Sequence, residues 1–287
     1  MASLAPDMGF DKIKSFAKIN LALNVISKST KLHRIESLVS FIELHDKILI
    51  KKIKSKKHNI IFKGKFSKKI KTENTVSKLL KILDQKKLMN HRFLIQIDKR
   101  IPQKSGLGGG SMNAANILKY FIKKKIINMN KKQIIEISNL VGSDVILGLK
   151  STHSVLTSKN KIKRFKNCPR LYTLVVMPKF GCSSKYIYSK VKKFDKIEFA
   201  IPKKNMFNPE LLKIMSNSLE PIALSKYPDL KKIKNYLINL RSPIFVRMTG
   251  SGSAFVSYYF SKNRCDKAHK EFIRDNKNCW SISSKTI

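Results

Sequence analysis

Four of the eleven glycines in this chain lie within residues 106–110, and Ser111 follows them directly. Glycines leave the main chain bare, so a ligand can approach its N–H groups closely. At the start of a helix these groups are unpaired and lie at the positive end of the helix dipole, which suits a phosphate. The stretch therefore predicts a phosphate-binding turn, in which Ser111 or Asn113 either caps the helix or contacts a phosphate or its metal ion.

Neither of two well-known glycine motifs fits this turn. A Walker loop ends in Gly-Lys-Ser/Thr, but here Gly110 is followed by Ser111 without a lysine. A dinucleotide-binding fingerprint requires a third glycine where this chain has Ser111, and no ribose-binding acid follows at the usual distance. A plain turn between a strand and a helix needs only one or two glycines. We therefore expect a phosphate site of another kind.

Two charged side chains stand in apolar surroundings elsewhere in the sequence. Lys18 lies between Ala17 and Ile19, at the head of an apolar segment that also holds Asn20. Asp144 directly precedes the apolar residues 145–149 in a chain that has few carboxylates. A turn-forming aspartate is common, so a purely structural role for Asp144 stays open at this point.

Hydrophobic periodicity predicts the elements that flank the glycines. Apolar residues at positions 93, 95 and 97 recur with the period of a half-buried strand. From residue 114 to residue 122, apolar residues recur at helical spacing. The glycines should therefore join a strand to the beginning of a helix.

Three further elements are predicted in the same way. Residues 21, 23 and 25 alternate as in a strand. Asn130 and Gln133 have the spacing of a capping box at the start of a helix, which Gly142 is placed to end as its C′ residue. In residues 247–260, two apolar strands flank the letters TGSGS, which predicts a glycine-bearing hairpin or loop.

Length and charge restrict the class of protein. The 287 residues are 42% hydrophobic, which is enough for two domains with sizeable cores. Lys and Arg number 60 against 18 Asp and Glu, giving a net charge of +42. Such a field attracts nucleic acid, acidic membranes or anionic metabolites. Because the lysines are spread along the chain among many Ile and Asn residues, compositional drift explains them better than a dedicated nucleic-acid surface. In either case the field favours a phosphorylated substrate.

The sequence carries no sign of export or membrane insertion. Its N-terminal letters lack a secretion signal, and no apolar stretch is long enough to span a bilayer. The four cysteines, at positions 168, 182, 265 and 279, are far apart and form no C-x-x-C pair. We therefore expect reduced, partly buried thiols in a cytoplasmic protein, and no zinc site.

Taken in order, four stretches resemble a known superfamily: AKINLALNV (17–25), DKRIPQKSGLGGGSMNAA (98–115), GSDV (142–145) and MTGSGSA (248–254). They are similar to the small-molecule kinases of the galactokinase, homoserine kinase, mevalonate kinase and phosphomevalonate kinase (GHMP) superfamily. Within it, the resemblance is greatest to the family that phosphorylates the 2-hydroxyl of a cytidine diphosphate-linked methylerythritol, on the non-mevalonate route to isoprenoid precursors. The resemblance runs from about residue 14 to about residue 260.

The resemblance implies an α+β protein of two domains. Residues 1–163 would form a ribosomal-protein-S5-like, ATP-binding domain, and residues 164–287 a ferredoxin-like domain on the side of the second substrate. The polar and basic segment 158–170, which contains Pro169, is the expected boundary. ATP would be the phosphoryl donor, together with Mg²⁺, although the sequence shows no clear carboxylate partner for a metal in the glycine loop.

The resemblance also implies roles for individual residues. Asp144 would accept the proton of the attacking alcohol, and Lys18 would hold that carboxylate charged and steady the charge on the oxygen. The ATP loop would consist of Pro102, Gln103, Lys104, Ser105, Gly106, Leu107, Gly108, Gly109, Gly110, Ser111 and Met112.

The cytidine end of the substrate would be bound by three residues. Asn20 corresponds to a substrate contact of the family, His33 would hydrogen-bond the cytosine edge, and Tyr188 would stack on it. A surface histidine, a polar residue at a strand end and a competing Tyr186 are the alternatives at these positions. The family usually has Gly-Tyr-His where this chain has residues 31–33, so Leu32 replaces a tyrosine.

The chain departs from the family's usual residues at two further positions, with Met112 in place of a serine and Ser143 in place of an alanine.

The rival interpretations are another alcohol kinase of the same superfamily and a basic RNA-binding protein. The AKINLAL and DKRIP motifs argue against another alcohol kinase of the superfamily. Asp144 together with Lys18 argues against the second, because RNA binding requires neither. We therefore expect small-molecule partners, with no membrane and no specific nucleic acid.

Overall fold

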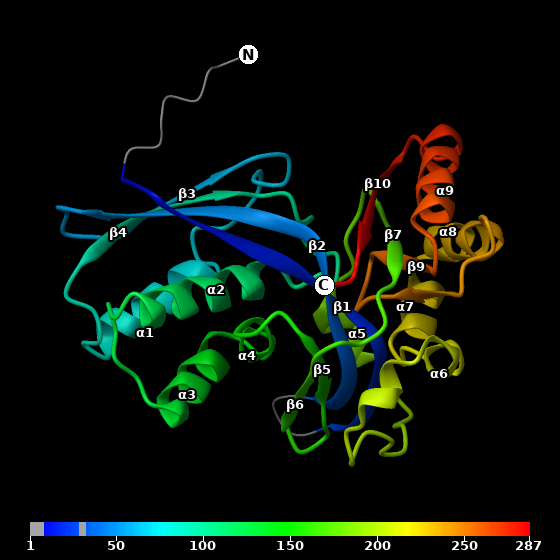
Figure 1. Ribbon diagram of the computed structural model, residues 1–287, viewed down its shortest axis with the longest axis horizontal. Coiled ribbons are helices and arrows are strands. Elements are labelled where there is room, and N and C mark those ends of the chain that lie inside the picture. Colours follow the sequence, from blue (N-terminus) through cyan, green and yellow to red (C-terminus); the bar gives the residue numbers. More distant parts are fainter. Residues whose placement is uncertain (1–8, 29–32) are drawn as a thin grey trace. The chain divides into compact units, whose positions relative to one another are not determined.

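The computed structural model describes residues 9–28 and 33–287, which form a mixture of helices and strands (Figure 1). The strands are β1 (Asp11–Lys28), β2 (His33–Ile53), β3 (Asn59–Lys63), β4 (Arg92–Asp98), β5 (His153–Leu156), β6 (Ile162–Phe165), β7 (Tyr172–Pro178), β8 (Phe245–Met248), β9 (Phe255–Tyr259) and β10 (Cys279–Lys285). The helices are α1 (Thr75–Gln85), α2 (Gly109–Lys123), α3 (Lys131–Val141), α4 (Val145–Gly148), α5 (Ser184–Ser189), a 3₁₀ helix (Lys204–Phe207), α6 (Pro209–Ile214), α7 (Glu220–Lys226), α8 (Pro228–Asn239) and α9 (Lys262–Asp275).

The chain forms two compact units that do not follow a single cut in the sequence. The first unit contains the residues up to Ala17 together with Leu44–Pro102 and Gly108–Lys150. The second contains Lys18–Glu43, Gln103–Leu107 and Ser151–Ile287. The boundary expected between residues 163 and 164 lies inside β6, within the second unit. The assignment of the two linear halves to ATP and to the second substrate stays a prediction.

In the first unit, helices cover one face of a sheet (Figure 1). Strand β3 pairs with β4 in parallel, and β4 pairs antiparallel with residues 47–53 of β2. Along β4, buried and half-buried positions alternate, as the sequence predicts. The sheet and helices α1, α2 and α3 share a cluster of buried apolar side chains, in which Phe93 of β4 lies 4.9 Å from Phe121 of α2, measured between ring centroids. Burying such a side chain stabilises the fold by roughly 1.5–3 kcal/mol.

Side-chain hydrogen bonds cap the N-termini of two of these helices. The predicted capping box of α3 is confirmed, because Asn130 accepts from the N–H of Gln133 at 2.9 Å and the Gln133 side chain accepts from the N–H of Asn130 at 2.8 Å. Asn74 and Ser77 form a second capping box at the start of α1. Such caps satisfy N–H groups that have no acceptor within the helix.

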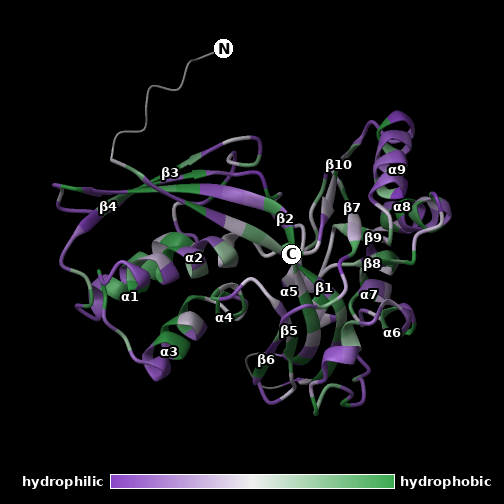
Figure 2. Ribbon diagram, in the orientation of Figure 1, coloured by the Kyte–Doolittle hydropathy of each residue, from purple (hydrophilic) through white to green (hydrophobic). Residues whose placement is uncertain are grey.

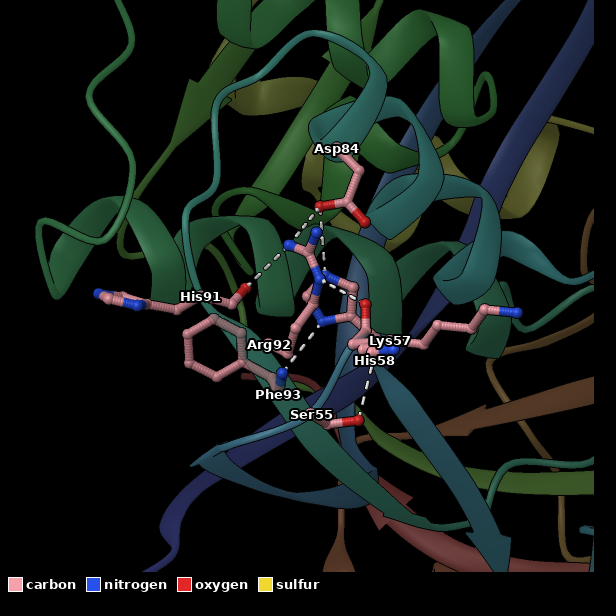
Figure 3. A network of polar contacts seen from close by, with 8 residues as sticks. Ser55, Lys57, His58, Asp84, His91, Arg92 and Phe93 are labelled. Carbon is pink, nitrogen blue, oxygen red and sulfur yellow. Dashed lines mark hydrogen bonds and ion pairs between the residues drawn. The ribbon is translucent and has the colours of Figure 1, made fainter.

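A polar network joins α1 to the two strands beside it (Figure 3). The carboxylate of Asp84 in α1 contacts Arg92 at 3.0 Å and His58 at 3.4 Å. The opposite ring nitrogen of His58 accepts the N–H of Phe93 at 3.1 Å. Burial lowers the pKa of His58, so its ring favours the neutral form. The network fixes the beginning of β3 and of β4. Strand β4 then leads into the glycine turn, which lies within residues 102–112.

The second unit contains a four-stranded antiparallel sheet in the order β10-β7-β9-β8. Strands β8 and β9 pair antiparallel from Phe245 with Tyr258 to Met248 with Phe255, which confirms the hairpin predicted around TGSGS. In Figure 2, α9 is mostly hydrophilic, yet it buries Cys265, Ala268 and Phe272 against the sheet. One narrow apolar stripe is therefore enough to hold this helix.

All four cysteines are free, with Cys182 and Cys265 buried and the other two half-buried, as expected. Burial raises the pKa of the Cys182 and Cys265 thiols to about 11. Within residues 9–28 and 33–287, none of the helices combines the length and the apolar character that crossing a membrane requires.

Candidate active site

The glycine turn joins β4 to α2, as the sequence predicts. Helix α2 begins at Gly109, and its N-cap Gly108 has a φ of 69°, in the left-handed region that favours glycine. Gly108 offers no side chain to the N–H groups of the first helical turn. These groups, on Gly109, Gly110 and Ser111, have no acceptor within the helix, as in any α-helix. The local geometry is therefore that of a helix start suited to an anion.

Two glycines of the turn are required by protein neighbours as well. Gly106 has a φ of 78°, and a Cβ at this position would collide with the carbonyl oxygen of Thr249. A Cβ on Gly109 would lie 2.9 Å from Cγ2 of Ile101 and 3.1 Å from Nζ of Lys99. The sequence accounts for these glycines by the approach of a phosphate alone. Close packing of the turn against the protein is a second reason, and no local sequence signal reveals it.

The TGSGS hairpin lies against the first part of the glycine turn, within the second unit. The N–H of Ser253 donates to the carbonyl of Lys104 at 3.3 Å, and the N–H of Ala254 donates to that of Ser105 at 3.1 Å. The carbonyl of Gly106 accepts from the Thr249 hydroxyl at 3.3 Å. Residues more than 140 positions apart therefore form one structure, a relation that no local pattern in the sequence predicts.

Neither candidate residue caps α2 with its side chain. Asn113 is buried and donates through Nδ2 to the carboxylate of Asp46 at 2.9 Å. Met112 is also buried, and its N–H donates to the carbonyl of Gly108 at 2.9 Å, so it already has an acceptor. Ser111 is half-buried in the first turn. Of the three, Ser111 is thus the residue best positioned to contact an anion or its metal ion.

Asp144 lies beside this helix start, within the first unit. It is the half-buried N-cap of α4, whose Gly148 packs so closely on α2 that a Cβ there would lie 2.7 Å from Cβ of Ala115. A Cβ on Gly142, two residues before Asp144, would lie 3.9 Å from Oγ of Ser111. Helix α3 ends at Val141, so Gly142 is its C-cap, one position earlier than the C′ predicted. The acid-bearing turn and the first turn of α2 are therefore neighbours.

Lys18 and Asn20 belong to a buried network in the second unit. The Lys18 ammonium donates to Oδ1 of Asn20 at 2.7 Å, and Nδ2 of Asn20 donates to the Ser37 hydroxyl at 2.8 Å. The Asn20 N–H donates to the Thr249 hydroxyl at 3.0 Å, and the Lys18 N–H donates to the carbonyl of Leu107 at 3.1 Å. The network thus ties the head of the β1 apolar segment to both the glycine turn and the TGSGS hairpin.

His33 and Tyr188 are brought together, also within the second unit. Their ring centroids are 5.1 Å apart, and the planes are tilted by 39°. Among the described residues, none gives a hydrogen bond to or takes one from the buried Nε2 of His33. Burial is the main cause that lowers the His33 pKa, and the charge of Lys28 adds to it. Leu32, whose effect on stacking was in question, lies outside the described residues.

The rival Tyr186 faces elsewhere. Its ring is approached by the ammonium groups of Lys190 at 5.5 Å and Lys226 at 5.1 Å, measured to the ring centroid. Of these two tyrosines of α5, Tyr188 is therefore the one whose ring contacts His33.

Several buried polar residues support the site without having been predicted. Asn217 donates to the carbonyls of Met248 and Gly250, both at 2.8 Å, and Glu220 accepts the N–H of Met248 at 2.8 Å. Each bond fixes the main chain of the TGSGS hairpin. Single polar residues of this kind carry no local pattern, so sequence reasoning had nothing by which to select them.

No group of three or more His, Cys, Asp or Glu side chains is arranged to hold a metal ion in the described part of the chain. Mg²⁺ that arrives with a nucleotide does not need such a group, because it usually keeps several waters and is bound through one or two protein ligands together with substrate phosphates.

Comparison with known proteins identifies the fold. The GHMP kinases N terminal domain matches residues 74–154. In fold, the chain is similar to the crystal structure of a 4-(cytidine 5'-diphospho)-2C-methyl-D-erythritol kinase (TM-score 0.77, 22% identity, 96% of this chain and 100% of the other). It is also similar to homoserine kinase from Cytophaga hutchinsonii (TM-score 0.72, 13% identity, 100% and 97%). The glycine turn and this architecture define the GHMP kinase fold, as the sequence predicted.

Relatives in sequence narrow the class further. A 4-diphosphocytidyl-2-C-methyl-D-erythritol kinase from Pelagibacter ubique is 55% identical over 277 residues, which is 96% of this chain and 99% of the relative. The protein of the same description from Caldicellulosiruptor bescii is 31% identical, over 92% of this chain and 96% of the relative. The chain belongs to the 4-diphosphocytidyl-2-C-methyl-D-erythritol kinase family.

Proposed function

We propose that this protein transfers the γ-phosphoryl group of ATP to the 2-hydroxyl of 4-(cytidine 5'-diphospho)-2-C-methyl-D-erythritol, a step of the non-mevalonate route to isoprenoid precursors. The observation that carries the proposal is the 55% identity over 96% of the chain to a kinase named for this substrate. A reaction between two charged, water-soluble substrates fits the cytoplasm, where we expect the enzyme to act.

In the proposed reaction, residues 102–112 bind the triphosphate of ATP. The N–H groups at the start of α2 would face the phosphate oxygens, and the left-handed Gly108 lets the main chain turn into the helix without a side chain. Phosphoryl transfer depends chiefly on positioning and on neutralising charge. Met112 would contribute packing and not an N–H group, because its N–H is bonded to Gly108.

Asp144 is proposed to accept the proton of the attacking hydroxyl. The alcohol oxygen then bonds to the γ-phosphorus, the bond from that phosphorus to the β,γ-bridging oxygen breaks, and ADP leaves. A tertiary alcohol is a weak nucleophile, so removal of its proton during attack lowers the barrier. The neighbourhood of the Asp144 turn and the first turn of α2 supports this role.

Lys18 is proposed to supply positive charge to the reacting groups. Its ammonium group is 5% exposed and is oriented by Asn20, which in turn is held by Ser37. A charge that is fixed in a site of low exposure stabilises developing negative charge more strongly than a mobile surface lysine does.

Mg²⁺ is proposed to bind together with ATP and to neutralise the phosphate oxygens. Ser111, in the first turn of α2, is the candidate side-chain ligand. The remaining coordination would come from phosphate oxygens and water.

His33 and Tyr188 are proposed to bind the cytosine base. The buried Nε2 of His33, without a partner among the described residues, is suited to a hydrogen bond with the base edge. The lowered pKa keeps this ring neutral, so one ring nitrogen donates and the other accepts. Tyr188 would offer its ring face for stacking.

The test is a coupled assay of ADP release that compares the cytidine substrate with homoserine, mevalonate and galactose. We expect turnover with the cytidine substrate alone, and a ³¹P spectrum that shows a new phosphomonoester on the 2-oxygen. Faster turnover of another alcohol would reassign the protein within the GHMP kinases. ADP release without any alcohol would indicate an ATPase.

A further inference from the structure

A single buried carboxylate, that of Asp46 in β2, holds both ends of the glycine loop. Asp46 is completely buried, and it lies in the first unit. Its Oδ1 accepts the N–H groups of Arg100 at 2.7 Å and Ile101 at 2.9 Å. Its Oδ2 accepts Nδ2 of Asn113 at 2.9 Å and pairs with the ammonium group of Lys99.

The partners of Asp46 lie on both sides of the glycine loop in the sequence. Ile101 directly precedes the loop of residues 102–112, and Asn113 directly follows it. One carboxylate therefore closes the base of the loop from both sides. Lys99 and Ile101 also form the surface on which Gly109 packs, since a Cβ there would meet both of them.

Aspartate is chemically suited to this task. An ionised carboxylate is acceptor-only and has about four lone-pair sites, which matches the four donors around Asp46. Hydrogen bonds to a charged group are roughly twice as strong as neutral ones. An asparagine at this position would turn N–H donors towards groups that are themselves donors.

We infer that Asp46 is a positioning residue that sets the affinity for ATP by fixing both ends of the loop before the nucleotide binds. This inference rests on the proposed function of the loop. A loop whose ends are already held loses less conformational freedom when it orders around a ligand, so binding is tighter. Asp46 is buried behind the loop and acts through it, without touching the nucleotide.

Two variants test the inference with matched controls. Asn113→Ala releases the far end of the loop and keeps the buried pair of Asp46 and Lys99. Asp46→Asn removes the carboxylate charge, but it also leaves Lys99 buried without its counter-charge and can prevent folding. Lys119→Ala, at an exposed position of the same helix, and Asp98→Asn, in a partly exposed pair with Arg100, are the controls.

The first measurement is the dissociation constant of Mg·ATP, and the second is KM for each substrate. Asn113→Ala should weaken ATP binding at least tenfold, with the KM for the cytidine substrate within twofold of wild type. Amide hydrogen exchange in residues 102–112 should become faster without ligand. Both controls should match wild type in all three readouts.

The possible failures can be told apart. A wild-type protein that binds no ATP would contradict the proposed function itself. If wild type binds ATP and a folded Asn113→Ala variant binds it equally well, the role of Asp46 is wrong. An equal loss of affinity for both substrates would also overturn it, since that would indicate general structural damage.

Discussion

Asp144 is the residue on which the proposed chemistry depends most directly. It begins the short helix α4, next to the first turn of α2, and its side chain does not cap α4. The packing of α4 is carried by other residues, such as the buried Val145 and Leu147. Removing the carboxylate should therefore affect chemistry far more than folding.

We expect Asp144→Ala to lower kcat by roughly 10²- to 10⁴-fold, the range typical of losing a general base. The thermal unfolding midpoint and the KM for ATP should change little. The measurement is steady-state ADP release, with circular dichroism as the check on folding. Turnover equal to that of wild type would remove Asp144 from the mechanism.

Tyr188 makes a second prediction at this scale. Tyr188→Ala should raise the KM for the cytidine substrate by roughly 5- to 150-fold, as expected for losing a base-stacking contact of about 1–3 kcal/mol. The KM for ATP should stay within about twofold. Tyr186→Ala, in the same helix but facing two lysines, is the matched control. Equal effects on both substrates would count against stacking by Tyr188.

At the scale of elements, the TGSGS hairpin and residues 104–106 of the glycine turn are joined into one structure within the second unit. Two main-chain hydrogen bonds join them, and Gly106 packs directly on the carbonyl of Thr249. Asn217 and Glu220 form hydrogen bonds to the main chain of the hairpin. The shape of the turn therefore depends on a segment that is distant in sequence.

Gly106→Ala should separate these two segments. Because the added Cβ would meet the Thr249 carbonyl at a positive φ, we expect the free energy of unfolding to fall by roughly 2 kcal/mol or more. Urea titration measures this loss. Gly142→Ala is the control, because its backbone is extended and its added methyl would meet no atom nearer than 3.7 Å. A stability of Gly106→Ala equal to that of wild type would show that the packing is not needed.

Periodic features of the fold could be predicted from the sequence, whereas single long-range contacts could not. Strand β4, helix α2, the α3 capping box and the β8–β9 hairpin all have local patterns and are present. The expected capping of α2 by Ser111 or Asn113 is not, because the helix begins earlier, after Gly108, and Asn113 bonds to Asp46 instead. Asp46 itself is one aspartate in a strand, and nothing near it in the sequence indicates its partners.

At the scale of the whole molecule, several of the few Asp and Glu residues stabilise the fold from buried positions. Three of them, Glu36, Asp46 and Glu220, are buried and accept main-chain N–H groups of distant segments. The large excess of positive charge comes from Lys and Arg side chains that are spread along the chain. The net charge of +42 should therefore act as a broad field that attracts anions.

We expect kcat/KM for both anionic substrates to fall by roughly tenfold as salt rises from low to well above physiological concentration, because screening weakens the field. The kcat itself should change little. Initial rates at several salt concentrations, at constant Mg·ATP, provide the measurement. A salt-independent kcat/KM would show that the charge does not steer substrates. Tight, steeply salt-dependent binding of any RNA would instead favour the nucleic-acid interpretation.

The hydrogen bonds from Ser253 and Ala254 to Lys104 and Ser105 also bear on synthesis of the chain. The ribosome makes residue 105 long before residue 254, and the last residues made are still inside its exit tunnel. During that interval the glycine loop lacks the TGSGS hairpin that shapes it. A chain that ends before residue 249 should thus contain every residue of the loop and yet lack the hairpin that shapes it, so we expect it not to bind ATP.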